Sequence, residues 1–94
     1  MLTGPQLANV IPECRRRLIA EEVLLVLSMC YDRTVTDEHT AWTDLHFSEP
    51  DFLRLGKTIL KYFPYVKTDP LPQTKSVIEL IHLLMQKVPP YVER

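Results

Sequence analysis

Glycine is scarce in this chain of 94 residues, which contains two, Gly4 and Gly56. A glycine-rich loop of the kind that holds nucleotide phosphates is therefore excluded. Cysteine is equally scarce, and Cys14 and Cys30 stand 16 residues apart. On one helix that separation is about 24 Å, which is too far for a disulfide. We interpret both as reduced thiols of an intracellular protein.

Long apolar runs and an excess of one charge are also missing. No apolar run approaches the roughly 20 residues that span a bilayer, so no membrane span is predicted. The formal net charge of -1 gives no sequence-wide attraction for nucleic acid or for an anionic membrane. Arg15, Arg16 and Arg17 form the one basic cluster of the sequence, which we interpret as a solvated helix face. A small nucleic-acid-binding regulator that uses these arginines is an alternative, but no nucleic-acid partner is expected.

Helical periodicity is what the sequence does contain, punctuated by eight prolines. Apolar residues make up 46% and charged residues 24%, a balance typical of a globular protein. We predict an all-α fold, a small bundle of three main helices with a short fourth helical turn over residues 4–10, capped by Thr3. One domain is expected over residues 1–94, with its core in residues 12–88 and a C-terminal tail from Tyr91.

The first main helix is predicted from Pro12 to Cys30 or Tyr31, because proline is tolerated in a first helical turn. Its segment 23–27 is apolar on every side, which predicts a central place in the bundle. The apolar positions expected to face the core are Leu18, Ile19, Val23, Leu24, Val26, Leu27 and Cys30.

The second main helix has the clearest start signal. Ser48 is predicted as its N-cap, and Glu49 and Asp51 place negative charge at the positive end of the helix dipole. Pro50 fits the first turn, and Pro64 ends the helix. The apolar residues recur at three- and four-residue steps, namely Phe52, Leu55, Ile59 and Phe63, with Leu53 and Leu60 widening the stripe.

Two loops separate the helices. Residues 32–47 are expected to form a long loop with Trp42 and Leu45 as anchors, and a loop of that length is often functional. Residues 64–75 form a proline-rich connector. The third helix is predicted to start at Thr74 or Ser76 and to stop at Pro89-Pro90.

The residues at the start of the second helix resemble a motif of acyl carrier proteins. That family of small helical bundles has a long first loop and the pattern D-L-G-x-D-S-L, and this chain reads Asp44-Leu45-His46-Phe47-Ser48-Glu49-Pro50-Asp51. Asp44 and Leu45 match, whereas His46 replaces the glycine, Ser48 the aspartate, Glu49 the serine and Pro50 the leucine. The likeness of layout covers residues 18–86, although the connector is short for the family's third helix.

The resemblance implies a carrier-like domain that binds proteins and carries no acyl group. In the family the serine is esterified by phosphopantetheine, which Glu49 does not allow, and the second helix is acidic. Here that helix is basic, so a neutral or acidic partner surface is implied. We expect a non-catalytic protein–protein interaction domain, an adaptor or structural subunit of a larger complex, without a cofactor. The expected partner-binding residues are Glu49, Phe52, Arg54, Lys57, Lys61, Tyr62 and Tyr65.

Two further alternatives stay open beside the nucleic-acid-binding regulator. A functional acyl or peptidyl carrier would bear phosphopantetheine on Ser48, one residue before the family's serine, although we prefer to interpret Ser48 as an N-cap. A homodimer is the other, because the apolar first helix can bury itself against a second copy.

Catalytic and metal chemistry find little support in the sequence. The polar loop residues Asp37, Glu38, His39, Asp44 and His46 lack the spacing of a zinc site, and we interpret them as a solvated loop. Cys30 ends a helix, where the dipole disfavours a thiolate, so we do not expect an enzyme. We expect a cytoplasmic protein, and the arginine-bearing first 20 residues leave organelle targeting as an alternative.

Overall fold

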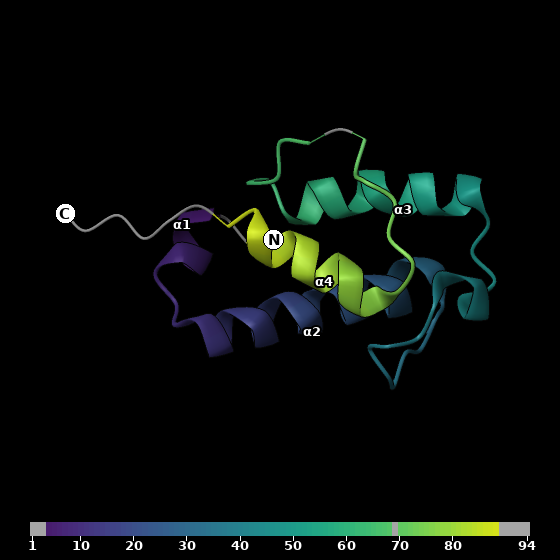
Figure 1. The fold of residues 1–94 in the computed structure, drawn as a ribbon, viewed down its shortest axis with the longest axis horizontal. Coiled ribbons are helices and arrows are strands. Elements are labelled where there is room, and N and C mark those ends of the chain that lie inside the picture. The colour runs from purple at the N-terminus through teal and green to yellow at the C-terminus, as the bar shows by residue number, and fades with distance from the viewer. Residues whose placement is uncertain (1–3, 69, 89–94) are drawn as a thin grey trace.

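The longest helix, α2, spans Pro12–Tyr31, as the sequence predicts. In the computed structural model, which describes residues 4–68 and 70–88, α2 runs along one edge of the molecule (Figure 1). It ends at Asp32, which takes a left-handed conformation with φ of 54° and donates its amide N–H to the carbonyl of Leu27. This left-handed residue satisfies a carbonyl that would otherwise have no partner at the helix end.

A short helix before α2 confirms the predicted N-terminal turn. It is α1, which spans Gly4–Ala8 and buries Leu7 completely. The guanidinium of Arg15 reaches back from α2 and donates to the carbonyl of Leu7 at 2.9 Å and to that of Val10 at 3.0 Å. These bonds satisfy carbonyls at the end of α1 and fix it to α2. The predicted Thr3 cap and the tail from Tyr91 lie outside the described residues.

The second main helix, α3, spans Glu49–Tyr62 and confirms the predicted start at Ser48. Phe52, Leu55 and Ile59 are buried on the side toward the core, in keeping with their three- and four-residue spacing. The amide of Phe63 makes the last bond to the helix, before the proline that follows.

The third main helix, α4, spans Val77–Gln86 and follows Ser76, one of the two predicted starts. Two of its first amides find their acceptors in the long loop after α2. Val77 donates to the carbonyl of Thr40 at 3.1 Å, and Ile78 donates to that of Glu38 at 2.7 Å. The side chain of Ser76 makes no capping hydrogen bond, so the loop backbone caps the start of α4 instead. The predicted stop at Pro89-Pro90 lies beyond the described residues.

The core forms where α4 packs across α2, with α3 on the other side of α4 (Figure 1). A short 3-10 helix, η1 (Trp42–Leu45), carries the predicted anchor Trp42, which is 4% exposed. Residues 41 and 76 form an isolated antiparallel bridge, and the described residues contain no β-strand beyond this bridge. The predicted all-α bundle is confirmed. No helix of the described residues has the length and apolar character needed to cross a membrane.

The predicted central place of α2 is wrong in part. Leu18, which was expected to face the core, is 38% exposed, and Cys30 is also exposed. Leu25 and Met29 of the same helix are 50% and 75% exposed. The reason is geometric, because α4 packs against one side of α2. Its outer side is left without a covering element among the described residues.

Candidate functional site

Reciprocal hydrogen bonds between Ser48 and Asp51 hold the start of α3. The amide of Asp51 donates to Oγ of Ser48 at 3.4 Å, and the amide of Ser48 donates to Oδ2 of Asp51 at 3.0 Å. The hydroxyl of Ser48 also donates to Oδ2, at 2.7 Å. The hydrogen bond from the backbone amide of Ser48, and after it the one from the Ser48 hydroxyl, hold the pKa of Asp51 below its usual value. Ser48 is thus a helix cap, as predicted, and its hydroxyl proton is held by a carboxylate.

His46, two residues earlier, has the second left-handed backbone among the described non-glycine residues. Its φ is 59°, and its amide donates to the carbonyls of Trp42 and Thr43 at the end of η1. Glycine takes this conformation most easily. Glu49 is exposed in the first turn of α3.

Three basic residues lie along the outer side of α3, which we call the basic row: Arg54, Lys57 and Lys61. All three are exposed, and their three- and four-residue spacing places them on one side of the helix. Arg54 has an intramolecular partner, since its Nη1 lies 3.6 Å from Oδ1 of Asp51. The basic row therefore concentrates positive charge on one side of α3 over about two helical turns.

A hollow of about 130 Å³ lies beside the basic row, and we call it the α3 groove. It is smaller than the roughly 300–1,000 Å³ of a small-molecule pocket, and it has room for one large side chain. A Cβ atom on Gly56 would stand 3.7 Å from Cβ of Leu71, so the glycine keeps part of the groove open. Leu53, which was expected to widen the buried stripe, is 51% exposed at its edge. The lining residues are Phe52, Leu53, Gly56, Lys57, Pro70 and Leu71.

The aromatic residues expected at the interface take different places. Phe52 is 6% exposed, packs edge-on against Trp42 and reaches the surface only as a wall of the α3 groove. Tyr62 stands at the other end of α3, where the neighbouring Cys30 raises the pKa of the phenol, first through its electrostatic effect and then through a hydrogen bond. Tyr65 points inward, and its hydroxyl donates to the carbonyl of Leu84 at 2.8 Å. Burial raises the pKa of Tyr65.

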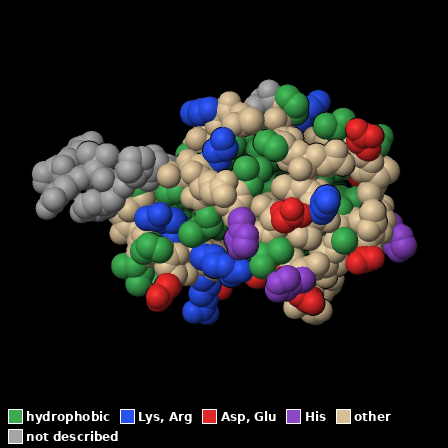
Figure 2. All heavy atoms as spheres, in the orientation of Figure 1, with side chains coloured by type: hydrophobic (Ala, Val, Ile, Leu, Met, Phe, Trp, Pro, Cys, Tyr) green, Lys and Arg blue, Asp and Glu red, His purple; other side chains and the backbone are tan. Residues whose placement is uncertain are grey.

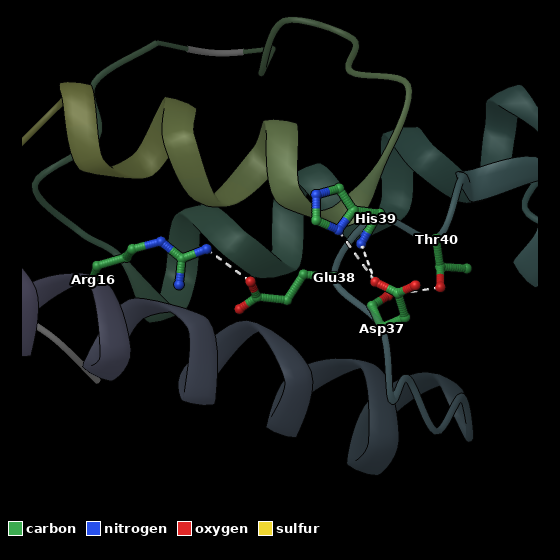
Figure 3. A network of polar contacts seen from close by, with 5 residues as sticks. All are labelled: Arg16, Asp37, Glu38, His39 and Thr40. Atoms are coloured by element: carbon green, nitrogen blue, oxygen red, sulfur yellow. Dashed lines mark hydrogen bonds and ion pairs between the residues drawn. The ribbon is translucent and has the colours of Figure 1, made fainter.

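The polar residues of the loop after α2 form two groups of contacts, one between Glu38 and Arg16 and one around Asp37 (Figure 3). Oε2 of Glu38 lies 2.7 Å from Nη2 of Arg16, which ties the loop to α2. Oδ1 of Asp37 accepts a hydrogen bond from the amide of His39 at 2.9 Å, and the hydroxyl of Thr40 donates to the carbonyl of Asp37. The hydrogen bond from the backbone amide of His39 is the main reason that the pKa of Asp37 lies below its usual value. Among residues 4–68 and 70–88, no group of three His, Cys, Asp or Glu residues could hold a metal ion.

The three consecutive arginines of α2 also have separate acceptors. Arg15 binds carbonyls at the end of α1, Arg16 binds Glu38, and Arg17 lies 3.1 Å from Glu21 on the same helix. They do not converge on one point as a phosphate site would require. Cys14 and Cys30 are free, exposed thiols.

The α3 groove is the feature that the sequence interpretation missed. Two of its six lining residues, Pro70 and Leu71, come from the connector, and the packing of this segment on α3 depends on the tertiary structure. One local signal was available, because Gly56 interrupts a helical pattern at a cost of about 1 kcal/mol relative to alanine. A glycine kept at such a position indicates a close approach or an opening.

Comparison of this chain with models of protein families, with curated proteins and with solved structures found no match. The function is therefore argued from the residues and geometry of the chain itself.

Proposed function

We propose that this chain is a non-catalytic protein–protein interaction domain, an adaptor or a structural subunit of a larger complex. Its partner binds the outer face of α3. The observation that carries the proposal is the α3 groove beside the basic row. The groove is an apolar hollow sized for one side chain, and positive charges border it. An anchoring side chain in a pocket with charged residues at the rim is a common layout of protein interfaces.

The chemistry of this surface defines the partner. A bulky apolar side chain would enter the groove between Leu53 and Leu71, and carboxylates beside it would face Arg54, Lys57 and Lys61. An amphipathic helix or extended segment with acidic residues meets both requirements. The apolar anchor would supply most of the affinity, whereas the exposed charges would speed association and select against basic partners.

The acyl-carrier-like layout supports the same proposal. The left-handed backbone at His46 stands where the family has glycine, and Ser48 caps the helix that follows. Glu49 at the place of the modified serine favours a domain that keeps the shape of a carrier without its cofactor. The intact mass of the protein from its own host distinguishes the two, since a carrier would show a phosphopantetheine increment that Ser48→Ala removes.

Charge reversal along the basic row tests the surface. Affinity purification from the native host first identifies the partner. The partner is then prepared in pure form, and its binding to this chain is measured by titration calorimetry. The combined change Arg54→Glu, Lys57→Glu and Lys61→Glu should weaken binding at least tenfold. The matched control is Lys67→Glu, Lys75→Glu and Lys87→Glu, which makes the same change in net charge on exposed residues that belong neither to α3 nor to the lining of the groove. Equal effects of the two triple variants would contradict the proposed surface.

A change at Gly56 separates binding from folding. Gly56→Ala adds a methyl group in ordinary contact with Leu71, at 3.7 Å and 3.8 Å, and narrows the groove. It should raise the free energy of unfolding by about 0.5–1 kcal/mol, because alanine favours a helix more than glycine does. Binding should nevertheless weaken several-fold. Tighter or unchanged binding in the stabilised variant would show that the groove does not receive the partner.

A further inference from the structure

A line of exposed hydrophobic side chains begins at Ile11, the residue just before α2, and runs along the outer side of the helix; we call it the outer stripe. Ile11, Leu18, Leu25 and Met29 are 63%, 38%, 50% and 75% exposed. They recur at steps of seven, seven and four residues, which places them on one side of a helix over about 27 Å. Steps of seven residues are the spacing of a helix–helix seam. The buried residues of α2 lie about 80° or more around the helix from this line, namely Ile19, Ala20, Val23, Val26 and Leu27.

Charged residues of opposite sign flank the outer stripe in a fixed order. At about 100° per residue, Arg17 and Glu21 lie on one flank, and Arg15 and Glu22 lie on the other. On both flanks the arginine comes first along the helix. Arg17 and Glu21 are 81% and 62% exposed, so their mutual contact at 3.1 Å is open to exchange with other partners. Figure 2 shows hydrophobic and charged side chains of both signs together at the lower left, where α2 begins in Figure 1.

We propose that two copies of this chain associate through the outer stripe, with their α2 helices antiparallel and Leu18 close to the two-fold axis. Leu18 then meets Leu18 of the second copy, and Ile11 meets Leu25. Antiparallel helices related by a two-fold axis bring the same flank of each copy together. Arg17 of one copy therefore comes within about 3 Å, along the helix axis, of the level of Glu21 in the other.

The order of charges selects this arrangement over the parallel one. In a parallel pair, opposite flanks meet at the same level, so that Glu21 faces Glu22. Arg17 then faces the flank of Arg15, whose guanidinium is already bonded to the carbonyls of Leu7 and Val10. Like charges would then oppose each other along the seam. In the antiparallel pair Arg17, which precedes Leu18, comes beside Glu21, which follows Leu18, of the other copy, and the same contact occurs twice across the two-fold axis. The outer stripe is thus complementary to itself and matches a second copy of the chain.

The contact area predicts a weak dimer. A strip about 27 Å long and about 10 Å wide is roughly 300 Å² per copy, less than the roughly 800 Å² that each partner buries in a stable interface. The chain should therefore be a monomer at low micromolar concentration and a dimer at several hundred micromolar. This surface is separate from the α3 groove, so a dimer of α2 leaves the proposed partner site on α3 open.

Sedimentation equilibrium of the full chain tests the proposal. Between 5 and 500 µM, the mass should rise from the 11.0 kDa of one chain toward twice that value. Leu25→Glu should remove the rise, whereas Leu53→Glu is the matched control because Leu53 has nearly the same exposure, 51% against 50%. A monomer at every concentration would overturn the proposal, and so would an equal loss in both variants. Circular dichroism shows that each variant is folded.

Two further variants test the orientation without touching the apolar contact. Arg17→Glu should raise the dissociation constant at least threefold, and the swap of Arg17→Glu with Glu21→Arg should restore it. In a background with Cys14→Ser and Cys30→Ser, Leu18→Cys should form an interchain disulfide on mild oxidation. Leu25→Cys should not, because the two thiols would lie about 21 Å apart along the axis. Efficient crosslinking through Leu25→Cys would establish a parallel pair and overturn the antiparallel one.

Discussion

The indole Nε1 of Trp42 donates a hydrogen bond of 2.9 Å to Oγ1 of Thr74, and this bond joins η1 to the connector before α4. Trp42 is 4% exposed and stacks on Phe47, with 5.6 Å between ring centroids. An indole N–H at such a depth requires an acceptor within the protein. The bond therefore adds a side-chain link to the backbone bonds that join the two segments, among them the one from the amide of Trp42 to the carbonyl of Lys75 at 3.1 Å.

Removal of the acceptor should leave the indole N–H without a partner. Thr74→Val keeps the shape of the side chain, and we expect it to lower the free energy of unfolding by about 1–3 kcal/mol. Thr74→Ser retains the hydroxyl and should cost clearly less. Urea denaturation followed by tryptophan fluorescence measures both, and equal losses for the two variants would contradict the role of this bond.

His46→Gly should stabilise the fold. A side chain in the left-handed region costs about 1–2 kcal/mol, and the greater freedom of glycine in the unfolded chain offsets part of the gain. We expect a net increase of about 0.5 kcal/mol in the free energy of unfolding. Ser28→Gly, on an exposed turn of α2, is the control and should have the opposite sign. A destabilised His46→Gly protein would show that the imidazole makes contacts worth more than the backbone strain.

The capping box of α3 should make stability depend on pH in the acid range. Hydrogen bonds from Ser48 lower the pKa of Asp51 in the folded state. The stabilisation is therefore complete above the unfolded pKa of about 3.9, and it is lost as the pH falls through the folded value. Asp51→Asn lacks this titration. The difference in stability between the wild type and Asp51→Asn, measured from pH 7 to pH 2, should shrink as the pH falls, and a constant difference would count against the capping role.

The buried phenol of Tyr65 should make stability depend on pH in the alkaline range. Burial raises its pKa, so the folded state keeps the proton when the unfolded state releases it near pH 10. This contribution is fully present below pH 10 and declines as the pH rises above that value. Tyr65→Phe should cost about 1 kcal/mol at pH 7 through the lost bond to Leu84, and the cost should grow smaller above pH 10. Ultraviolet titration of the wild type should also show one tyrosine that ionises only on unfolding.

The helices could be predicted because their signals are local. Pro12 opens α2, and the Ser48–Asp51 pair opens α3, each through groups within one helical turn. The exposure of Leu18 could not be predicted in the same way, since the burial of an apolar side depends on whether another element arrives to cover it. The α3 groove was missed for a related reason, because Leu71 reaches Gly56 from a segment with no periodicity of its own.

The capping of α4 by the distant loop also bears on the order of folding. The carbonyls that receive the amides of Val77 and Ile78 belong to Thr40 and Glu38, nearly 40 residues earlier in the chain. Such a loop must close before these bonds can form, whereas α2 and α3 can start from neighbouring residues. We expect α4 to complete its first turn last, so that closure of this loop sets the rate at which the chain folds.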